Sequence, residues 1–259
     1  MGVKTAVLVV SFGTSHTDTL GKTIEAIEGR IGLEFPGYVV RRAFTSGIIM
    51  KIWRERGVVI DSVGDALLSL VDEGFETVIV QPTHIINGVE YEKMLAQIQP
   101  FMARTRIHAG TPLLTDVHDY KEVARALVSD AGNMDSDEMI VFMGHGSSHH
   151  SSSAYSQMEY VFHDMGFTRS IIGTVEGYPG LEEVKRRLRE RAEIKKVCLQ
   201  PFMVVAGDHA KNDMSGSGPD SWKSVLEQMG YSVTCNMRGL GEYGAIRDLF
   251  SRHARAACG

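Results

Sequence analysis

Two histidines and a glutamate in the second half of the chain have the types and spacing to hold a metal ion. His145 lies between two glycines, Glu176 precedes a glycine, and His209 follows Asp208. Two imidazoles and one carboxylate suit a borderline divalent ion such as Co, Fe, Ni or Zn, and they leave coordination positions open. These three residues are therefore predicted to form a metal site, with Asp208 as a candidate hydrogen-bond partner of a ligand.

The chain repeats itself, and only the second copy carries these ligand types. Residues 77–94 (TVIVQPTHIINGVEYEKM) are echoed by residues 196–213 (KVCLQPFMVVAGDHAKND). Residues 7–15 (VLVVSFGTS) are echoed by residues 140–148 (IVFMGHGSS). Such matched segments predict a duplicated scaffold in which one copy has acquired a metal site.

A third, weaker echo relates RAFTSG (residues 42–47) to GTVEGY (residues 173–178). A single histidine on a loop is more often a capping or surface residue than a ligand. Three ligand types that all match positions of a repeat favour a site over that alternative. Across the three echoes the paired residues are Phe12 and His145, Thr45 and Glu176, and Glu90 and His209.

Both halves alternate short apolar runs with amphipathic stretches, a pattern that predicts parallel strands joined by crossover helices. Ligands bind outside the carboxyl ends of the strands in open parallel sheets, where the paired residues fall. We expect an α/β fold of two similar lobes, each a parallel sheet flanked by helices, with a cleft between them. The expected strands are 6–10, 38–43, 77–80, 106–109, 139–143, 170–175, 197–199 and 231–236, and the expected helices are 20–31, 63–72, 91–98, 155–165, 181–191, 221–229 and 243–257.

The boundary between the lobes is expected near residues 129–137, where small and acidic residues cluster. This gives an N-terminal lobe of residues 1–130 and a C-terminal lobe of residues 131–259 that carries the metal ligands. The last helix, at about residues 243–257, could pack back on the first lobe.

Composition narrows the class of protein. The chain has 259 residues, of which 43% are hydrophobic and 23% charged, and a net charge of -5. These values are ordinary for a globular protein and give no basic footprint for nucleic acid. No apolar stretch approaches membrane-spanning length, and no signal segment precedes the first strand. We therefore expect a cytoplasmic protein with neither nucleic acid nor a membrane as its partner, and a homo-oligomer is compatible with the sequence.

Two glycine-containing turns, SFGTS and GHGSS, superficially resemble phosphate-binding loops. Neither has the GxxxxGK[ST] or GxGxxG spacing, so no bound nucleotide is expected. GHGSS also lacks the GxSxG pattern of a nucleophile elbow, which argues against a serine hydrolase.

Several residues in the first half have two interpretations. Glu90 could relay protons opposite a metal site, or satisfy the dipole at the first turn of a helix. His84 could line a cleft or be a satisfied loop histidine. A group of basic residues could grip carboxylates or form a solvated helix face; its members are Arg41, Arg42, Lys51, Arg54 and Arg56.

The longer motifs are VVSFGTS, RAFTSG, HIINGVEYEK, VFMGHGSSHH and VAGDHAKNDM followed by DSWK. In these motifs the chain resembles the anaerobic sirohydrochlorin cobaltochelatases of cobalamin biosynthesis, the CbiK family of class II, ATP-independent tetrapyrrole chelatases. The resemblance runs from the first strand through GLGE (residues 239–242). It implies two similar lobes with the tetrapyrrole held between them.

The resemblance also implies a reaction, which is insertion of Co2+ as substrate metal into sirohydrochlorin with release of two protons. His145, Glu176 and His209 match the family's metal-side residues, and Glu90 matches an acidic residue on the opposite wall. His145, His209 and Glu90 are accordingly expected to be catalytic. The residues expected to contact the tetrapyrrole are Ser11, Phe12, Gly13, Thr14, Arg54, His84, Gly144 and Gly146.

Two alternatives remain open. Fe2+ makes similar demands on nitrogen and oxygen ligands, so the same site could serve a sirohydrochlorin ferrochelatase that makes sirohaem. A non-enzymatic, two-lobed metal-binding protein, such as a solute-capturing receptor, would also present histidine and glutamate at strand ends.

Overall fold

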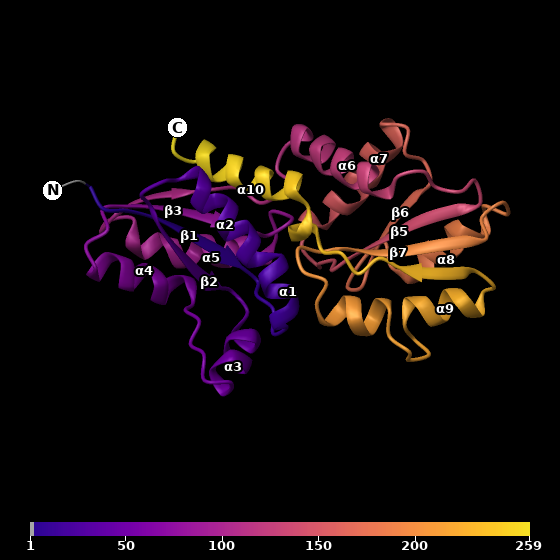
Figure 1. The fold of residues 1–259 in the computed structure, drawn as a ribbon, viewed down its shortest axis with the longest axis horizontal. Helices are drawn as coiled ribbons and strands as arrows, with labels where there is room; N and C mark the ends of the chain where they lie inside the picture. The colour runs from indigo at the N-terminus through magenta and orange to yellow at the C-terminus, as the bar shows by residue number, and fades with distance from the viewer. Residues whose placement is uncertain (1–2) are drawn as a thin grey trace. The chain divides into compact units, whose positions relative to one another are not determined.

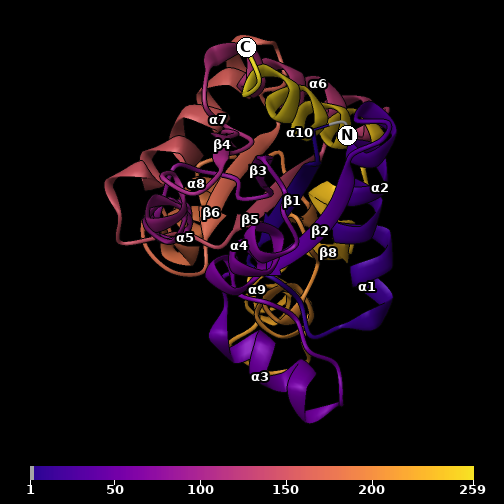
Figure 2. The same cartoon turned by 90° about the vertical axis from the view of Figure 1, so that its left-hand side faces the viewer.

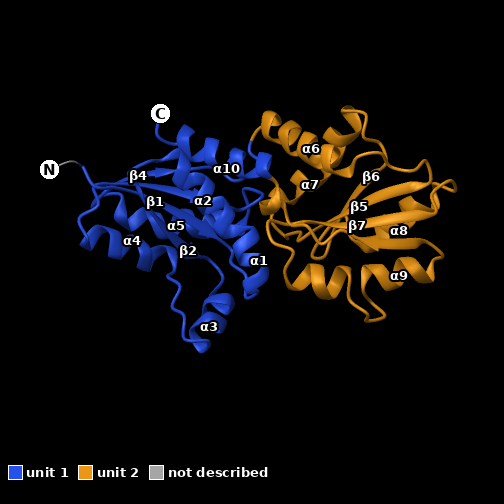
Figure 3. Cartoon of the chain, viewed as in Figure 1, with its two compact units in different colours: residues 1–115, 244–259 blue, residues 116–243 orange. Residues whose placement is uncertain are grey.

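The computed structural model describes residues 3–259 and divides the chain into two compact units (Figure 3). Unit 1 comprises Met1–Thr115 and Gly244–Gly259, and unit 2 comprises Asp116–Tyr243. The division differs from the boundary expected at residues 130 and 131. The reason is a helix that begins at Val117 and packs within unit 2 instead of completing the first lobe.

Each unit contains one four-stranded sheet in which every neighbouring pair of strands is parallel. The order is β2-β1-β3-β4 in unit 1 and β6-β5-β7-β8 in unit 2 (Figure 1). The strands are β1 (Thr5–Ser11), β2 (Val39–Phe44), β3 (Thr77–Pro82), β4 (Arg106–Ala109), β5 (Glu138–Gly144), β6 (Ser170–Thr174), β7 (Lys196–Phe202) and β8 (Ser232–Cys235). The α/β fold expected from the alternating pattern is confirmed.

In unit 1, helices cover both faces of the sheet. Figures 1 and 2 show α2 and α10 on one face and α4 and α5 on the other. Alternate residues of the central strand, such as Leu8 and Val10, pack with Leu67 and Met94 on the α4 and α5 face. The helices of unit 1 are α1 (Thr17–Lys22), α2 (Ile24–Glu34), α3 (Gly47–Glu55), α4 (Val63–Asp72), α5 (Val89–Ile98), the 3-10 turn η1 (Gln99–Phe101) and α10 (Gly244–Ala256).

Unit 2 has the same layered arrangement, with α6 and α7 on one face and α8 and α9 on the other (Figure 1). Phe142 of β5 stacks on Phe162 of α7, with 5.1 Å between the ring centroids. On the opposite face Val141 packs with Val184 and Trp222. The helices of unit 2 are α6 (Val117–Ala131), α7 (Ser153–Asp164), α8 (Leu181–Arg189), α9 (Trp222–Gln228), the 3-10 turns η2 (His150–Ser152) and η4 (Leu240–Glu242), and the π-helix η3 (Ala210–Met214).

Three helices differ from the expected pattern, and one of them is α3 (Gly47–Glu55), for which no bounds were expected. The stretch expected as one helix from residue 20 to 31 is broken at Thr23, whose φ of -118° and ψ of -83° lie outside the helical region. Helix α6 was not expected at all. It begins with a capping box in which Asp116 and Asp119 bond each other's backbone N–H groups. Among residues 3–259 no helix combines the length and the apolar character needed to cross a bilayer.

The repeat in the sequence corresponds to the repeat in the fold, with one correction. In the strand registers Ser11 pairs with Phe44 and Gly144 pairs with Thr174. Phe44 is therefore equivalent to Thr174, and the residue equivalent to Glu176 is Ser46, not Thr45. The weak third echo was misaligned by one residue because it contains few identities.

Candidate metal centre

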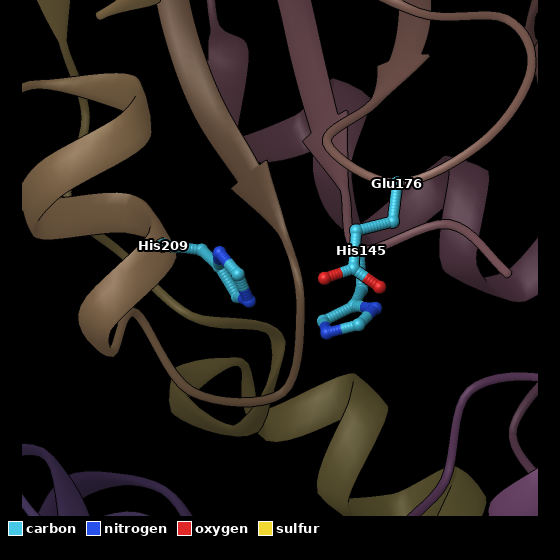
Figure 4. Close-up of side chains that lie close together, drawn as sticks. All are labelled: His145, Glu176 and His209. Carbon is cyan, nitrogen blue, oxygen red and sulfur yellow. The ribbon is translucent and has the colours of Figure 1, made fainter.

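The structure brings His145, Glu176 and His209 together at the carboxyl ends of the strands of unit 2 (Figure 4). One ligand atom from each residue lies within 4.8 Å of the other two. The imidazole rings of His145 and His209 are nearly perpendicular, at 85°, with 4.8 Å between their centroids. Glu176 is exposed and the two histidines are half-buried, so the three candidate ligands form a partly open cluster.

The loops that carry His145 and Glu176 are joined by their backbones. Val175 N–H donates to Gly144 O at 3.0 Å, and Glu176 N–H donates to His145 O at 2.7 Å. This approach requires glycine at position 146, where φ is +85° and an added Cβ would lie 1.7 Å from the carbonyl oxygen of Glu176. The glycine therefore fixes the spacing between two of the three ligands.

His209 begins the π-helix η3 at the end of the loop that follows β7. Its Nδ1 lies 2.7 Å from a carboxylate oxygen of Asp213, one turn further on. The sequence indicated Asp208 as a candidate hydrogen-bond partner, and the contact between His209 and Asp213 was not predicted. The signal was the spacing of four residues between His209 and Asp213, which places two side chains on one helical face.

A second segment holds the His209 loop in place. Leu240 N–H donates to Met203 O at 2.8 Å, and Gly241 N–H donates to Val204 O at 3.0 Å. An added Cβ on Gly239 would lie 2.6 Å from Val204 O. The segment GLGE therefore stabilises the loop that carries the candidate ligand His209.

The hydrogen bonds of the two histidines select the nitrogen that faces a metal. Nδ1 of His145 lies 3.1 Å from the carbonyl oxygen of Gly146, and Nδ1 of His209 faces Asp213. A carbonyl oxygen and a carboxylate only accept, so Nδ1 of each neutral ring donates. Each Nε2 then carries the lone pair that can bind a metal ion.

Glu90 lies in the first turn of α5 in unit 1. This is the position that the second interpretation, interaction with the helix dipole, requires. Its Oε1 accepts a hydrogen bond from Lys93 Nζ at 2.5 Å, whereas its Oε2 is buried without a hydrogen-bond partner among the described residues. Burial raises the pKa of Glu90. Lys93, the nearby Thr45 hydroxyl and His84 outweigh that effect and leave the pKa below its usual value. The Thr45 hydroxyl lies near the carboxylate but outside good hydrogen-bond geometry.

His84 is buried at the end of β3, and neither ring nitrogen has a hydrogen-bond partner within residues 3–259. It is therefore not the satisfied loop histidine of the second interpretation. Burial lowers the pKa of His84 to about 4, despite the neighbouring charge of Glu90. His84 is consequently neutral at physiological pH.

The end of β1 and the loop after it hold four of the residues expected to contact a tetrapyrrole. The Ser11 side chain is buried and accepts a hydrogen bond from the Thr83 hydroxyl at 2.8 Å. Thr14 is also buried, and its carbonyl oxygen accepts from Trp53 Nε1 at 2.7 Å. Phe12 is 45% exposed, so it presents an apolar ring to a ligand. The fourth residue, Gly13, has a φ of +104°, and Gly144 and Gly146 are buried.

Most of the basic group in unit 1 is engaged in ion pairs. Arg42 holds Glu28 through two nitrogens, at 2.7 and 2.6 Å, and this carboxylate raises the pKa of Arg42. Arg41 pairs with Glu73 at 2.9 Å. Arg56 donates to the carbonyl oxygen of Ser15. Lys51 lies 3.9 Å from Glu55, and Arg54 is exposed on α3. Helix α3 is therefore the part of the group that retains a cationic surface.

Comparison with known proteins identifies relatives along nearly the whole chain. The family model described as cobalt chelatase (CbiK) matches residues 5–258. The sirohydrochlorin cobaltochelatase of Salmonella typhimurium is 40% identical over 257 residues, which cover 98% of this chain and 97% of that protein. The sirohydrochlorin cobaltochelatase CbiKC of Nitratidesulfovibrio vulgaris is 34% identical over 259 residues, which cover 98% of this chain and 90% of that protein.

The fold also has a counterpart among solved structures. SirB from Bacillus subtilis, determined with Fe3+, aligns with a TM-score of 0.68 over 98% of this chain and 96% of that chain. The sequence identity is 15%, so this likeness concerns the fold alone. It confirms the two-lobed α/β architecture.

Proposed function

The chain belongs to the cobalt chelatase (CbiK) family, and we propose that it inserts Co2+ into sirohydrochlorin at the centre formed by His145, Glu176 and His209. The observation that carries the proposal is the convergence of these three side chains, with their ligand atoms within 4.8 Å of one another. A ferrochelatase would use the same ligands, so a competition between Co2+ and Fe2+ separates the two metals.

The ligand set suits a metal that is a substrate. Two imidazoles and one carboxylate leave open positions on Co2+, where pyrrole nitrogens can replace water and protein ligands in turn. Glu176 is exposed, so its carboxylate can be exchanged without opening the core. The site would hold the ion firmly enough to position it and weakly enough to release it into the ring.

Metal insertion also requires an acceptor for the two pyrrole protons. Glu90 is proposed for this role because it is the repeat counterpart of His209 and its carboxylate is ionised at neutral pH. Its buried Oε2 has no partner among residues 3–259 and so has an unused acceptor. Glu90→Gln keeps the shape and removes the base. We expect a kcat lowered by about 10-fold or more with unchanged Co2+ affinity, and an unaltered kcat would remove the role.

Recognition of the macrocycle is proposed for residues of unit 1. Phe12 exposes an aromatic ring and Arg54 exposes a guanidinium on α3, which suit the apolar faces and the carboxylates of sirohydrochlorin. The cytoplasmic location, the absence of a nucleotide and the compatibility with a homo-oligomer remain predictions.

An absorbance assay tests the proposed function. Protein, Co2+ and sirohydrochlorin are mixed, and the spectral change of the macrocycle is compared with the spontaneous rate. We expect wild-type protein to accelerate the change and the His145→Ala and His209→Ala variants to lose that acceleration while remaining folded by circular dichroism. Full activity in either variant would refute the assignment of the centre.

A further inference from the structure

We propose that Asp213 is a positioning residue that makes His209 the anchoring ligand of Co2+. The inference rests on the proposed function, because it concerns the same metal centre. Asp213 would act through His209 and would not bind the ion itself.

The contact between the two residues is short and directional. His209 Nδ1 and Asp213 Oδ2 lie 2.7 Å apart, and a carboxylate can only accept, so the ring nitrogen donates. The other ring nitrogen, Nε2, is thereby fixed as the metal-binding atom. Carboxylates in this position orient a ligating histidine and increase its donor strength.

The backbone that carries Asp213 is held rigidly. Ser215 N–H donates to Ala210 O at 3.1 Å across five residues, as in a π-turn. Ala210 and Met214, on either side of the turn, are completely buried in the core of unit 2. Asp213 therefore projects from an anchored turn, although its side chain is 48% exposed.

The hydrogen bonds that Nδ1 makes in the two histidines have different acceptors. His145 donates to a neutral backbone carbonyl at 3.1 Å, whereas His209 donates to a carboxylate at 2.7 Å. Hydrogen bonds to charged acceptors are shorter and about twice as strong as those between neutral groups. The carboxylate therefore strengthens His209 as a donor to Co2+, and we expect His209 to retain the ion while other ligands are exchanged for pyrrole nitrogens.

The test measures Co2+ affinity in the absence of sirohydrochlorin, by titration of the full-length protein. We expect Asp213→Ala to weaken Co2+ binding by about 10- to 100-fold, with unchanged thermal unfolding. Asp220→Asn is the charge control, because Asp220 is exposed beyond the π-helix, and it should bind as wild type does. Asp213→Asn, which keeps the size of the side chain, takes the place of the alanine variant if the latter does not fold.

A double-mutant cycle with His209→Ala separates a positioning role from a general electrostatic one. If Asp213 acts through His209, then Asp213→Ala has no further effect on Co2+ affinity in the His209→Ala background. Unchanged affinity in Asp213→Ala, an equal loss in Asp220→Asn, or an equal loss in the His209→Ala background would each overturn the inference. Failure of the wild-type protein to metallate sirohydrochlorin would refute the proposed function. The Co2+ affinities of the variants would still test whether Asp213 acts through His209.

Discussion

At the scale of single residues, the two units differ in the side chains that follow equivalent strands. Unit 2 carries His145, Glu176 and His209, where unit 1 carries Phe12, Ser46 and Glu90. The two strong echoes indicated His145 and His209 as candidate ligands, whereas Glu176 was indicated by its residue type and by the weak third echo, which was misaligned by one residue. The contact between His209 and Asp213 was not predicted, because the spacing of four residues permits it but the sequence does not reveal the π-turn that brings the two side chains together.

His84 makes the stability of unit 1 depend on pH. Its pKa is about 4 in the folded protein and about 6.5 in the unfolded chain, so the unfolded state binds more protons between these values. The contribution of His84 to the free energy of unfolding is therefore complete above pH 6.5. It is lost as the pH falls from 6.5 to 4, by about 3 kcal/mol in total.

Urea unfolding at neutral and mildly acidic pH measures this effect. His84→Gln removes the titrating group, so we expect it to lose less stability on acidification than wild type does. His150→Gln is the matched control for a histidine-to-glutamine substitution, because His150 is exposed. Equal pH dependence in His84→Gln and wild type would contradict the account of His84.

At the scale of elements, the strands were easier to predict than the helices. Apolar runs such as residues 139–143 identified the strands within two residues of their observed ends, except that β7 continues beyond residue 199 to Phe202. Helix α6 was not predicted because its capping box contains Asp119 where glutamate or glutamine is more common. The break at Thr23 was not predicted because apolar residues continue at helical spacing on both sides of it.

The joined loops of unit 2 make a prediction at this scale. Gly146→Ala would drive a Cβ into the Glu176 carbonyl and should separate the two loops, which weakens Co2+ binding and lowers stability. Gly166→Ala is a matched control, since its φ of +86° is almost the same but no atom lies within 4 Å of the added Cβ. The control should lower the free energy of unfolding by only about 1–2 kcal/mol, which is the cost of placing alanine in the left-handed backbone region. Equal Co2+ affinities in the two variants, measured by titration, would contradict the prediction.

At the scale of the whole molecule, the fold is a duplication whose last helices are exchanged. The helix after β4 belongs to unit 2, and the helix after β8 belongs to unit 1 (Figure 3). A boundary drawn from composition alone could not reveal this exchange, because local sequence does not record which sheet a terminal helix covers. The expectation for residues 243–257 named a helix that could pack on the first lobe, and the structure places α10 against α2.

The exchanged helix provides a test that separates stability from metal binding. Phe250 of α10 is completely buried in unit 1, so Phe250→Ala should lower the free energy of unfolding by about 3–5 kcal/mol. Co2+ affinity should be unchanged, because all three ligands belong to unit 2. Leu33→Ala on α2 is the control, since Leu33 is 80% exposed. Wild-type stability of Phe250→Ala in chemical denaturation would contradict this packing.

The central claim is that Co2+ passes from the His145, Glu176 and His209 centre into the macrocycle. A single-turnover experiment tests it most directly. Protein loaded with stoichiometric Co2+ is mixed with metal-free sirohydrochlorin and an excess of chelator that traps free Co2+, and the absorbance of the macrocycle is followed. The account predicts that the loaded protein metallates the ring despite the chelator and that His209→Ala does not. Metallation that disappears whenever the chelator is present would mean that the ring takes free Co2+, and it would contradict the account.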